Sequence, residues 1–405
     1  MRIAVAGMLS LAVAMGIGRF AFTPLLPMML SEHLVDLAGA SWLASANYLG
    51  YLVGALACTL QPWLWRRLAW LPPLRSGPVV RCGLVATCLL TLGMMLPVPH
   101  LWPTLRFAAG VASAFVFVFT SGWCLVQLAR RDASALGGVM YAGPGGGIIA
   151  SGIAAGALLH WGQTARTGWL AFGLLAVVLS AAIWPAFAEP PGQPVGGAAS
   201  ARPDTSARAP AAEQSLLAIA YGMAGFGYII SATFLPVIAR QAIAGSPWLD
   251  LFWPIFGAGV VTGALLVTRV RTARDLRPPL ALCYLVQALG IAIGLWRPTV
   301  AGFALGSILL GLPFTTITFF ALQEARRLRP GGTHSFIGLL TATYGAGQIA
   351  GPLLAAWVLA RSASPAQGFN RSLGIAAAAL VAGALLYLVL ARRYPAQPRR
   401  GVSQM

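Results

Sequence analysis

The chain of 405 residues contains no lysine and only nine acidic residues, although it carries 27 arginines. A P-loop, a Schiff-base site and a kinase-type site each require a lysine, so all three are excluded. The glycine cluster at 143–147 lies within an apolar run and lacks the Gly-Lys-Ser/Thr end of a phosphate-binding loop. Any work that needs energy must therefore draw on a gradient rather than on ATP hydrolysis by this chain.

Charged residues of all kinds are scarce, at 9% of the chain against 58% apolar residues. This composition leaves too little polar surface to cover a soluble particle. The net charge of +18 is divided among short segments rather than gathered on one face, which excludes a nucleic acid as partner. No C-x-x-C spacing occurs, so a disulfide framework or a zinc site is not expected from the five cysteines, Cys58, Cys82, Cys88, Cys124 and Cys283.

Patterns typical of hydrolytic enzymes are also missing. The sequence has no G-x-S-x-G motif and no paired acids within an apolar run, and the four histidines lie in loops or at the ends of runs. We therefore assign no catalytic residue, no metal ligand and no cofactor. An intramembrane enzyme stays open only as an alternative, which product formation in detergent without a membrane gradient would reveal.

Long apolar runs dominate the chain instead. At ~1.5 Å per residue, a helix of roughly 18 to 25 residues crosses a ~30 Å hydrocarbon core. The first run continues well past the length of a signal-peptide core, so we interpret it as a membrane helix. The sequence predicts twelve spans, at about 3–29, 41–62, 79–97, 102–127, 134–160, 167–188, 214–239, 248–268, 279–296, 300–324, 334–360 and 369–391.

Arginine falls almost entirely into every second gap between these runs. Twenty arginines belong to one set of gaps and five to the other, if Arg81 and Arg371, each the third residue of its run, are counted with the gap before them. Arg19 and Arg106 lie further inside their runs. Arginine-rich loops stay in the cytoplasm when a membrane protein inserts. The pattern therefore predicts that both termini and the 189–213 segment are cytoplasmic.

The 189–213 segment divides the chain into two similar halves, 1–188 and 214–405. It is rich in Pro, Gly, Ala and Ser, which predicts an unfolded linker between six spans on each side. GIGRFAFTPLLP from Gly16 and GFGYIISATFLP from Gly225 match at a constant offset of 209. Parallel repeats of this kind place a binding site between the halves at mid-depth.

Several local motifs strengthen this interpretation. Arg106 and Gly110 form an R-x-x-x-G pattern in the fourth span, and Gly143-Pro144 form a GP pattern in the fifth. Together with the segments at 16–27, 41–56, 221–240 and 341–354, they resemble the YbfB/YjiJ-type group of the major facilitator superfamily. The resemblance implies an all-α membrane protein of twelve transmembrane helices in two pseudo-symmetric six-helix bundles. One departure is that 54–67, where the superfamily carries an aspartate, has none.

Arg19 is the first candidate for substrate binding. It lies sixteen residues into the first span, which places it ~24 Å along the helix from the cytoplasmic end. Ionisable residues at such depth are rare and usually face a cavity or a partner, and the resemblance places the first helix against the central cavity. Its repeat position is Tyr228. The alternatives are that Arg19 binds backbone carbonyls near Gly16 and Gly18, or reaches the outer headgroups.

Further candidates come from polar residues and helix breakers inside the spans. For substrate binding we add Asn47, Tyr51, Tyr228, Thr315 and Gln348. Acids are scarce inside the spans, so the few that occur are candidates for coupling, and small residues beside prolines permit close helix packing and bending. For gating or coupling we therefore name Arg106, Asp250, Glu324, Gly143, Pro144, Gly351 and Pro352. Arg106 is equally well explained as a structural arginine on neighbouring carbonyls.

Taken together, these features predict a monomeric secondary transporter of the bacterial inner membrane with both termini in the cytoplasm. We expect a small organic solute, such as an organic anion or a drug-like metabolite, to move by alternating access with proton coupling. The expected partners are this solute and the lipid bilayer. A membrane sensor without transport is the other alternative, although the tails are too short for an output domain.

Overall fold

The computed structural model describes residues 1–67, 74–133, 136–188, 210–246, 248–267, 269, 275–328 and 333–396. Within these ranges the chain folds into helices joined by turns and short connections, and no strand occurs. The predicted linker at 189–213 lies almost wholly outside the described residues, which resume at Pro210.

The helices of the first half account for the first six predicted spans. The first span is α1, η1 and α2 in series, and the fifth is α6 and α7. Their bounds are α1 Arg2–Leu11, η1 Ala12–Ile17, α2 Phe22–Ser31, α3 Leu37–Arg67, α4 Ser76–Gly93, η2 Pro99–Leu101, α5 Trp102–Ala129, α6 Gly137–Tyr141, α7 Gly143–His160, α8 Ala165–Ile183 and η4 Trp184–Phe187.

The helices of the second half account for the other six spans, with the tenth span broken into α12 and α13. Their bounds are α9 Ala211–Ala242, η5 Leu249–Leu251, α10 Phe252–Val267, α11 Arg277–Trp296, α12 Val300–Gly311, α13 Phe314–Leu328, α14 Thr333–Leu359 and α15 Pro365–Arg393. Eleven of the spans in the described residues are long and apolar enough to cross a membrane. The remaining one is α14, a helix of 27 residues, so the twelve predicted spans are confirmed.

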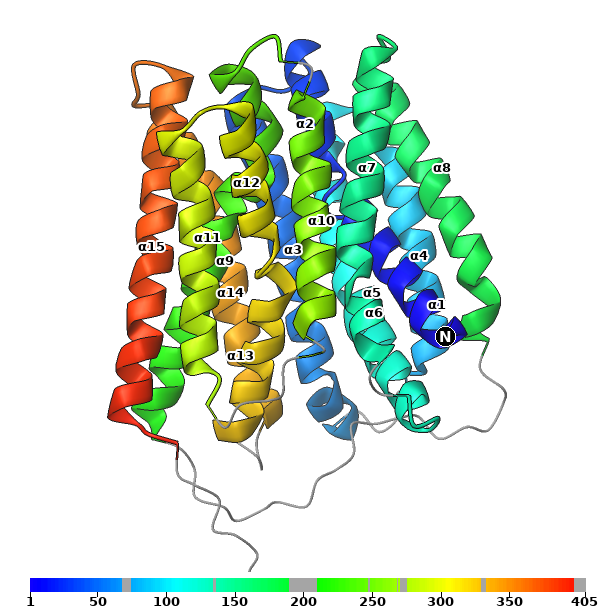
Figure 1. Cartoon of the computed structure of the whole chain (residues 1–405). Helices are drawn as coiled ribbons and strands as arrows, with labels where there is room; N and C mark the ends of the chain where they lie inside the picture. The colour runs from blue at the N-terminus through cyan, green and yellow to red at the C-terminus, as the bar shows by residue number, and fades with distance from the viewer. Residues whose placement is uncertain are drawn as a thin grey trace, which may run out of the picture.

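The two halves lie side by side as bundles, with α1 and α4 to α8 on the right of the view, α9 and α11 to α15 on the left, and α2, α3 and α10 near the middle (Figure 1). They meet where α3 packs on α14, α7 on α10, and α2 on α9. At the last contact the Thr23 hydroxyl donates a hydrogen bond of 3.0 Å to the carbonyl of Ala232. These two residues are 209 positions apart, which is the offset of the sequence repeat, so equivalent positions of the two halves touch.

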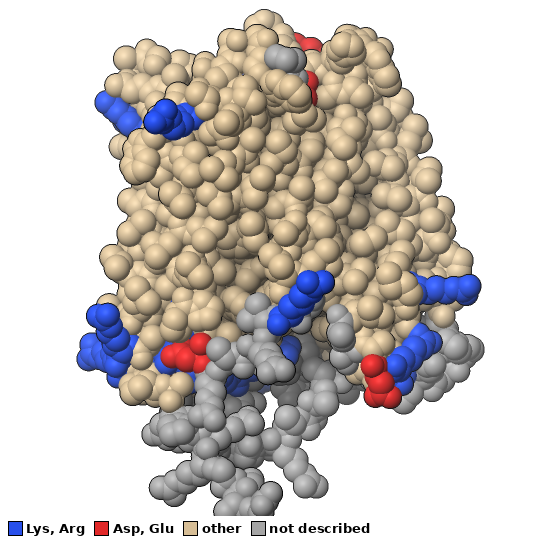
Figure 2. Space-filling model, viewed as in Figure 1, with Lys and Arg blue, Asp and Glu red and all other residues tan. Residues whose placement is uncertain are grey.

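A broad apolar belt surrounds the bundles. On the face shown, Arg, Asp and Glu side chains gather at the two ends and leave the middle free of charge (Figure 2). Large apolar side chains are exposed on the outward helix faces, among them Trp42, Leu89, Val178, Leu282 and Leu289. This surface matches a bilayer, because an apolar side chain loses nothing by facing lipid.

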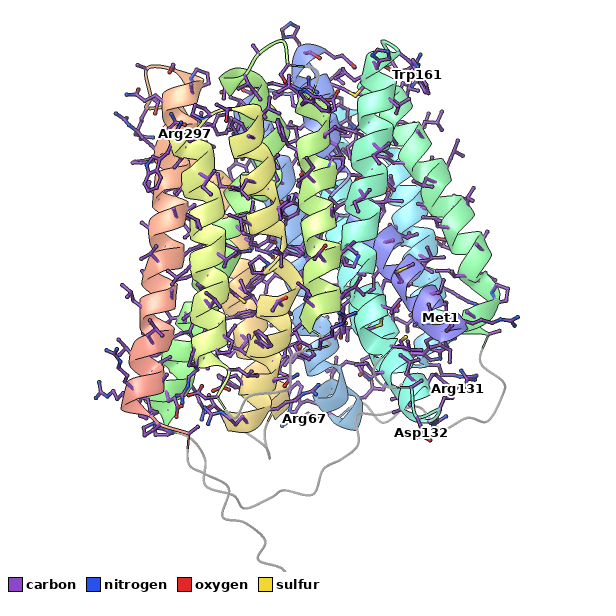
Figure 3. The ribbon with its side chains drawn as sticks, in the orientation of Figure 1. Met1, Arg67, Arg131, Asp132, Trp161 and Arg297 are labelled. Carbon is purple, nitrogen blue, oxygen red and sulfur yellow. The ribbon has the colours of Figure 1, made fainter. Side chains whose placement is uncertain are left out.

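The ends of the bundles agree with the arginine alternation. Met1, Arg67, Arg131 and Asp132 lie toward one end, whereas Trp161 and Arg297 lie at the other (Figure 3). Arg67 and Arg131 belong to the arginine-rich set of gaps and Arg297 belongs to the arginine-poor set. The two sets of gaps therefore lie on opposite sides of the apolar belt, as an alternating chain requires.

Candidate substrate site between the two halves

The first span is interrupted at mid-depth, next to Arg19. Residues 12–17 form a π-helix. Two further backbone hydrogen bonds of the π-helical i→i−5 type continue it into the turn before α2: Gly18 N donates to Val13 O at 2.8 Å, and Phe20 N donates to Met15 O at 3.0 Å. A Cβ on Gly16 would lie 2.4 Å from the Cα of Gly147, so the wide turn rests directly on α7. π-Helical turns recur at functional sites because they leave backbone groups free of the regular helix bonds.

Arg106 binds the carbonyls that this interruption leaves free. Its buried guanidinium donates to Gly18 O at 3.3 Å and to Arg19 O at 3.0 Å. The Asn47 side-chain amide in turn donates to the carbonyl of Arg106 at 2.8 Å. Arg106 and Asn47 thus hold the backbone that carries Arg19, while substrate contact by Asn47 stays a prediction.

The Arg19 side chain points across the interface between the halves. It is 3% exposed, and its Nη2 donates to Oε1 of Gln348 in α14 at 2.8 Å. The Gln348 amide nitrogen then donates to the hydroxyl of Tyr228 in α9. The Tyr51 ring centre lies 4.1 Å from the guanidinium carbon. The structure therefore brings together four of the six predicted substrate-binding residues.

The positive charge of Arg19 has no counter-charge among the described residues. No described carboxylate lies within ion-pairing distance of its guanidinium, and its Nε has no hydrogen-bond partner among them. Burying an unpaired charge costs several kcal/mol. The faces of Tyr51, Tyr48 and Phe20 compensate in part, at 4.1 to 5.2 Å from the guanidinium carbon.

Aromatic rings from both halves continue outward from Arg19. In the second half, Tyr344 stacks on Tyr228 at 6.0 Å and on Tyr221 at 4.7 Å between ring centres, with interplanar angles of 23° and 27°. Phe314 contacts Tyr228 edge-on at 5.0 Å. The Phe20 ring of the first half reaches Phe314 at 5.9 Å and Trp253 at 6.3 Å.

Apart from Tyr228, sequence reasoning did not single out these rings as candidates for substrate contact. A usable signal was present, because Tyr344 lies one turn before Gln348, and Tyr221 lies two turns before Tyr228 on one helix face. Thr315, the sixth predicted residue, follows Phe314 at the start of α13. Its hydroxyl is buried and has no hydrogen-bond partner among the described residues.

The predicted gating glycines pack inside their own halves. A Cβ on Gly143 would lie 2.2 Å from the carbonyl oxygen of Met8, and one on Gly351 would lie 2.2 Å from Ile229 Cγ2. Pro144 and Pro352 are buried beside them. Other small residues of α7 face the second half, since a Cβ on Gly145 would lie 2.7 Å from Gly257 O in α10. A gating role for the four predicted residues stays a prediction.

The two acids proposed for coupling are each bound to arginine. Asp250 pairs with Arg240 beside Leu159, at the end of α7 that Trp161 caps, and both side chains are about one third exposed. Its Cβ lies against Gly156 of the first half. Glu324 is fully buried and pairs with Arg327 and, at 3.5 Å, with Arg277. Neither acid contacts Arg19.

Arg277 is the centre of a buried charge cluster at the opposite end of the second half. It also binds Glu213 at 2.8 Å, Asp275 at 2.9 Å and the carbonyl oxygens of Leu390 and Tyr394. Burial acts to raise the pKa of the Asp275 carboxyl, but hydrogen bonds from Arg277 prevail and hold it below its ordinary value. The cluster ties α9, α11, α13 and α15 together, and the sequence analysis did not predict it.

The fold defines a class of protein: a multi-pass membrane protein of the major facilitator type, in which two six-helix bundles lie side by side. Two crystal structures share this fold. A mutant of the nucleoside transporter NupG matches with a TM-score of 0.70 at 12% identity, covering 96% of this chain and 99% of that one. Unmutated NupG matches with a TM-score of 0.67 at 12% identity, covering 96% and 98%.

The particular family follows from the sequence. The family model described as "Uncharacterised MFS-type transporter YbfB" matches residues 11–388, and the chain belongs to that family. None of the curated proteins compared matches this chain. At 12% identity the likeness to NupG shows the fold alone. The recognition and the fold class predicted from the sequence are confirmed.

Proposed function

We propose that this protein is a secondary active transporter of a small organic anion, which it binds through Arg19. The observation that carries the proposal is a buried guanidinium at the interface of the two halves with no described carboxylate to neutralise it. A carboxylate on the substrate supplies the missing charge. Arginine suits this role because its planar fork donates two parallel hydrogen bonds to a carboxylate.

The way in which the halves meet supports alternating access as the transport mechanism. The Arg19–Gln348–Tyr228 chain joins the first half to the second at mid-depth. The α3–α14 and α7–α10 contacts flank it. Rocking of one bundle against the other around a fixed central site is the usual motion of transporters built from repeats. The domains in this account are 1–188 and 214–405, joined by the 189–213 linker.

Proton coupling is the expected energy source, and Asp250 is the better placed of the two candidate acids. It lies at the interface against Gly156, and residues of both halves surround its pair with Arg240, including Pro24 and Trp253. Protonation of Asp250 releases Arg240 from its partner. Because this happens at a contact between the halves, it can bias their relative positions. Glu324 is enclosed within the second half.

We place the protein in the bacterial inner membrane as a monomer with both termini in the cytoplasm, in accord with the arginine alternation. The test of function is a thermal-shift screen of the purified full chain against small organic anions, cations and neutral solutes at equal concentration. A ligand present at 100 times its Kd stabilises by about 2.7 kcal/mol. Stabilisation by anions supports the proposal, and stabilisation by cations alone contradicts it.

A further inference from the structure

The contacts that Arg19 and the rings near it make across the interface indicate which ligand chemistry can replace them. Across the interface at Arg19 they include an amide oxygen on a guanidinium, aromatic rings on aromatic rings, and a hydrogen bond of 2.9 Å between the hydroxyls of Tyr48 and Thr233. Phe20 belongs to the first half, while Phe314 and Trp253 belong to the second. These contacts therefore separate when the halves move apart, and they leave a cation surrounded by uncovered rings.

Gln348 occupies half of the carboxylate position on Arg19. Nε and Nη2 form one edge of the guanidinium fork, and the two oxygens of a carboxylate match that edge. Oε1 of Gln348 accepts from Nη2 at 2.8 Å, whereas Nε has no partner among the described residues. A carboxylate that displaces the Gln348 amide fills both positions and neutralises the charge.

The rings around Arg19 determine the shape of the rest of the ligand. From the first half, Tyr51 lies 4.1 Å from the guanidinium carbon and Tyr48 lies 5.2 Å from it. From the second half, Tyr228 accepts a hydrogen bond from the Gln348 amide and stacks nearly parallel on Tyr344. A flat ring attached to the carboxylate can pack between these faces as the protein's own rings do.

The charge at the site fits one carboxylate rather than two. Arg106 is the other buried arginine nearby, but its Nη1 and Nη2 donate to the main-chain carbonyls of Gly18 and Arg19, and only its Nε has no partner among the described residues. Its guanidinium also lies over the ring of Phe22, 5.1 Å from the ring centre. A second carboxylate on the ligand would therefore find at most the single Nε–H of Arg106 and not a two-donor edge like that of Arg19, so its burial among the rings would be costly.

We propose that the substrate is an aromatic monocarboxylate, a single carboxylate on a flat ring. This inference rests on the proposed function and narrows it. In this proposal, Arg19 recognises the carboxylate of the substrate, and Tyr51, Tyr228 and Tyr344 recognise its ring. Gln348 joins Arg19 to Tyr228 across the interface and is the group that the carboxylate displaces.

The test compares benzoate with cyclohexanecarboxylate, which has the same charge and similar size but a puckered, saturated ring. Binding of each to the purified full chain is measured by isothermal titration calorimetry at pH 7.5, where both are anions. A favourable aromatic pair changes affinity by roughly two- to tenfold. We expect benzoate to bind at least about threefold more tightly than cyclohexanecarboxylate, and we expect terephthalate, which has two carboxylates, to bind more weakly than benzoate.

Variants of Tyr344 link this preference to the site. Tyr344→Phe keeps the ring and should keep the preference for benzoate, whereas Tyr344→Leu removes the ring and should abolish it. Phe314→Leu gives a second ring deletion if Tyr344→Leu does not yield a monodisperse protein. Arg19→Gln should abolish binding of both carboxylates.

Each contrary result has its own meaning. Equal affinity for benzoate and cyclohexanecarboxylate, with both dependent on Arg19, overturns the aromatic class and leaves the anion transporter standing. If benzoate does not bind but another organic anion binds through Arg19, the aromatic class is likewise overturned and the anion transporter stands. Benzoate binding that Arg19→Gln leaves unchanged overturns the assignment of the site and, with it, the proposed function.

Discussion

Replacement of Gly145 by alanine tests whether close packing of α7 on α10 holds the two halves together. An alanine Cβ at this position would lie 2.7 Å from Gly257 O, 2.8 Å from Val261 Cγ2 and 2.9 Å from Val261 N. Two of these three atoms are backbone, so no change of rotamer relieves the clash. To reach an ordinary contact of 3.4 Å from the carbonyl, the helices must move apart by about 0.7 Å.

The magnitude follows from the cost of overpacking. One extra methyl group in a tight contact costs about 1–3 kcal/mol. Gly146 provides a matched control, because it is the next residue of the same helix, it is exposed, and an added Cβ would meet nothing within 4 Å. Both variants gain the ~0.5–1 kcal/mol of helix propensity that alanine has over glycine, so the difference between them isolates the contact.

Two assays measure the effect. With an unfolding entropy of about 2 cal/mol/K per residue, a cost of about 1–3 kcal/mol lowers the melting temperature by roughly 1–4 °C relative to Gly146→Ala. The same cost shifts the equilibrium between joined and separated halves by about 5- to 150-fold. Maleimide labelling of a cysteine placed at Ala155, in a chain without its five native cysteines, should therefore speed up. If Gly145→Ala and Gly146→Ala melt and label alike, α7 and α10 are not in the close contact described here.

Three further predictions test separate parts of the account. Arg277→Met should lower the stability by about 3–5 kcal/mol in unfolding experiments, because it leaves buried carboxylates unpaired; an unchanged melting temperature would contradict the buried cluster. Gln348→Glu should raise the melting temperature and abolish anion binding, because the new carboxylate would form an ion pair with Arg19 and occupy the anion position. Retained anion binding in this variant would contradict the assignment of Arg19 as the anion-binding residue. Alkaline phosphatase should be inactive when fused after Ala209 and active when fused after Thr164, and the reverse pattern would overturn the cytoplasmic assignment of the termini.

Much of the fold could be predicted from the sequence because a bilayer imposes simple constraints. Span length and the arginine alternation gave the twelve helices, and the repeat offset of 209 reappears in the contact of Thr23 with Ala232. The position of Arg19 deep in the first span made it the first candidate for substrate binding, and the structure joins it to Gln348 and Tyr228. These predictions depend on order along the chain and on depth, both of which a sequence records.

The helix faces could not be predicted in the same way. In a membrane protein the lipid-facing and core-facing residues are both apolar, so hydrophobic periodicity does not tell which side of a helix meets which partner. For this reason the sequence did not show that Gly143 packs within its own half while Gly145 meets the other. The π-helix before Arg19 and the burial of Arg277 among three carboxylates likewise depend on tertiary packing.

The central claim is that Arg19 binds the anionic part of the substrate, and its affinity for an anion tests this most directly. The measurement is the Kd of the strongest anionic ligand from the thermal-shift screen for the wild-type chain, Arg19→Lys and Arg19→Gln, with the melting temperature of each. We expect Arg19→Lys to bind roughly tenfold more weakly, because it loses the planar fork. We expect Arg19→Gln to bind at least about 30-fold more weakly, because the charge is gone, while it still melts cooperatively. Wild-type affinity in Arg19→Gln would contradict the claim and make Arg19 an internal brace of the first helix.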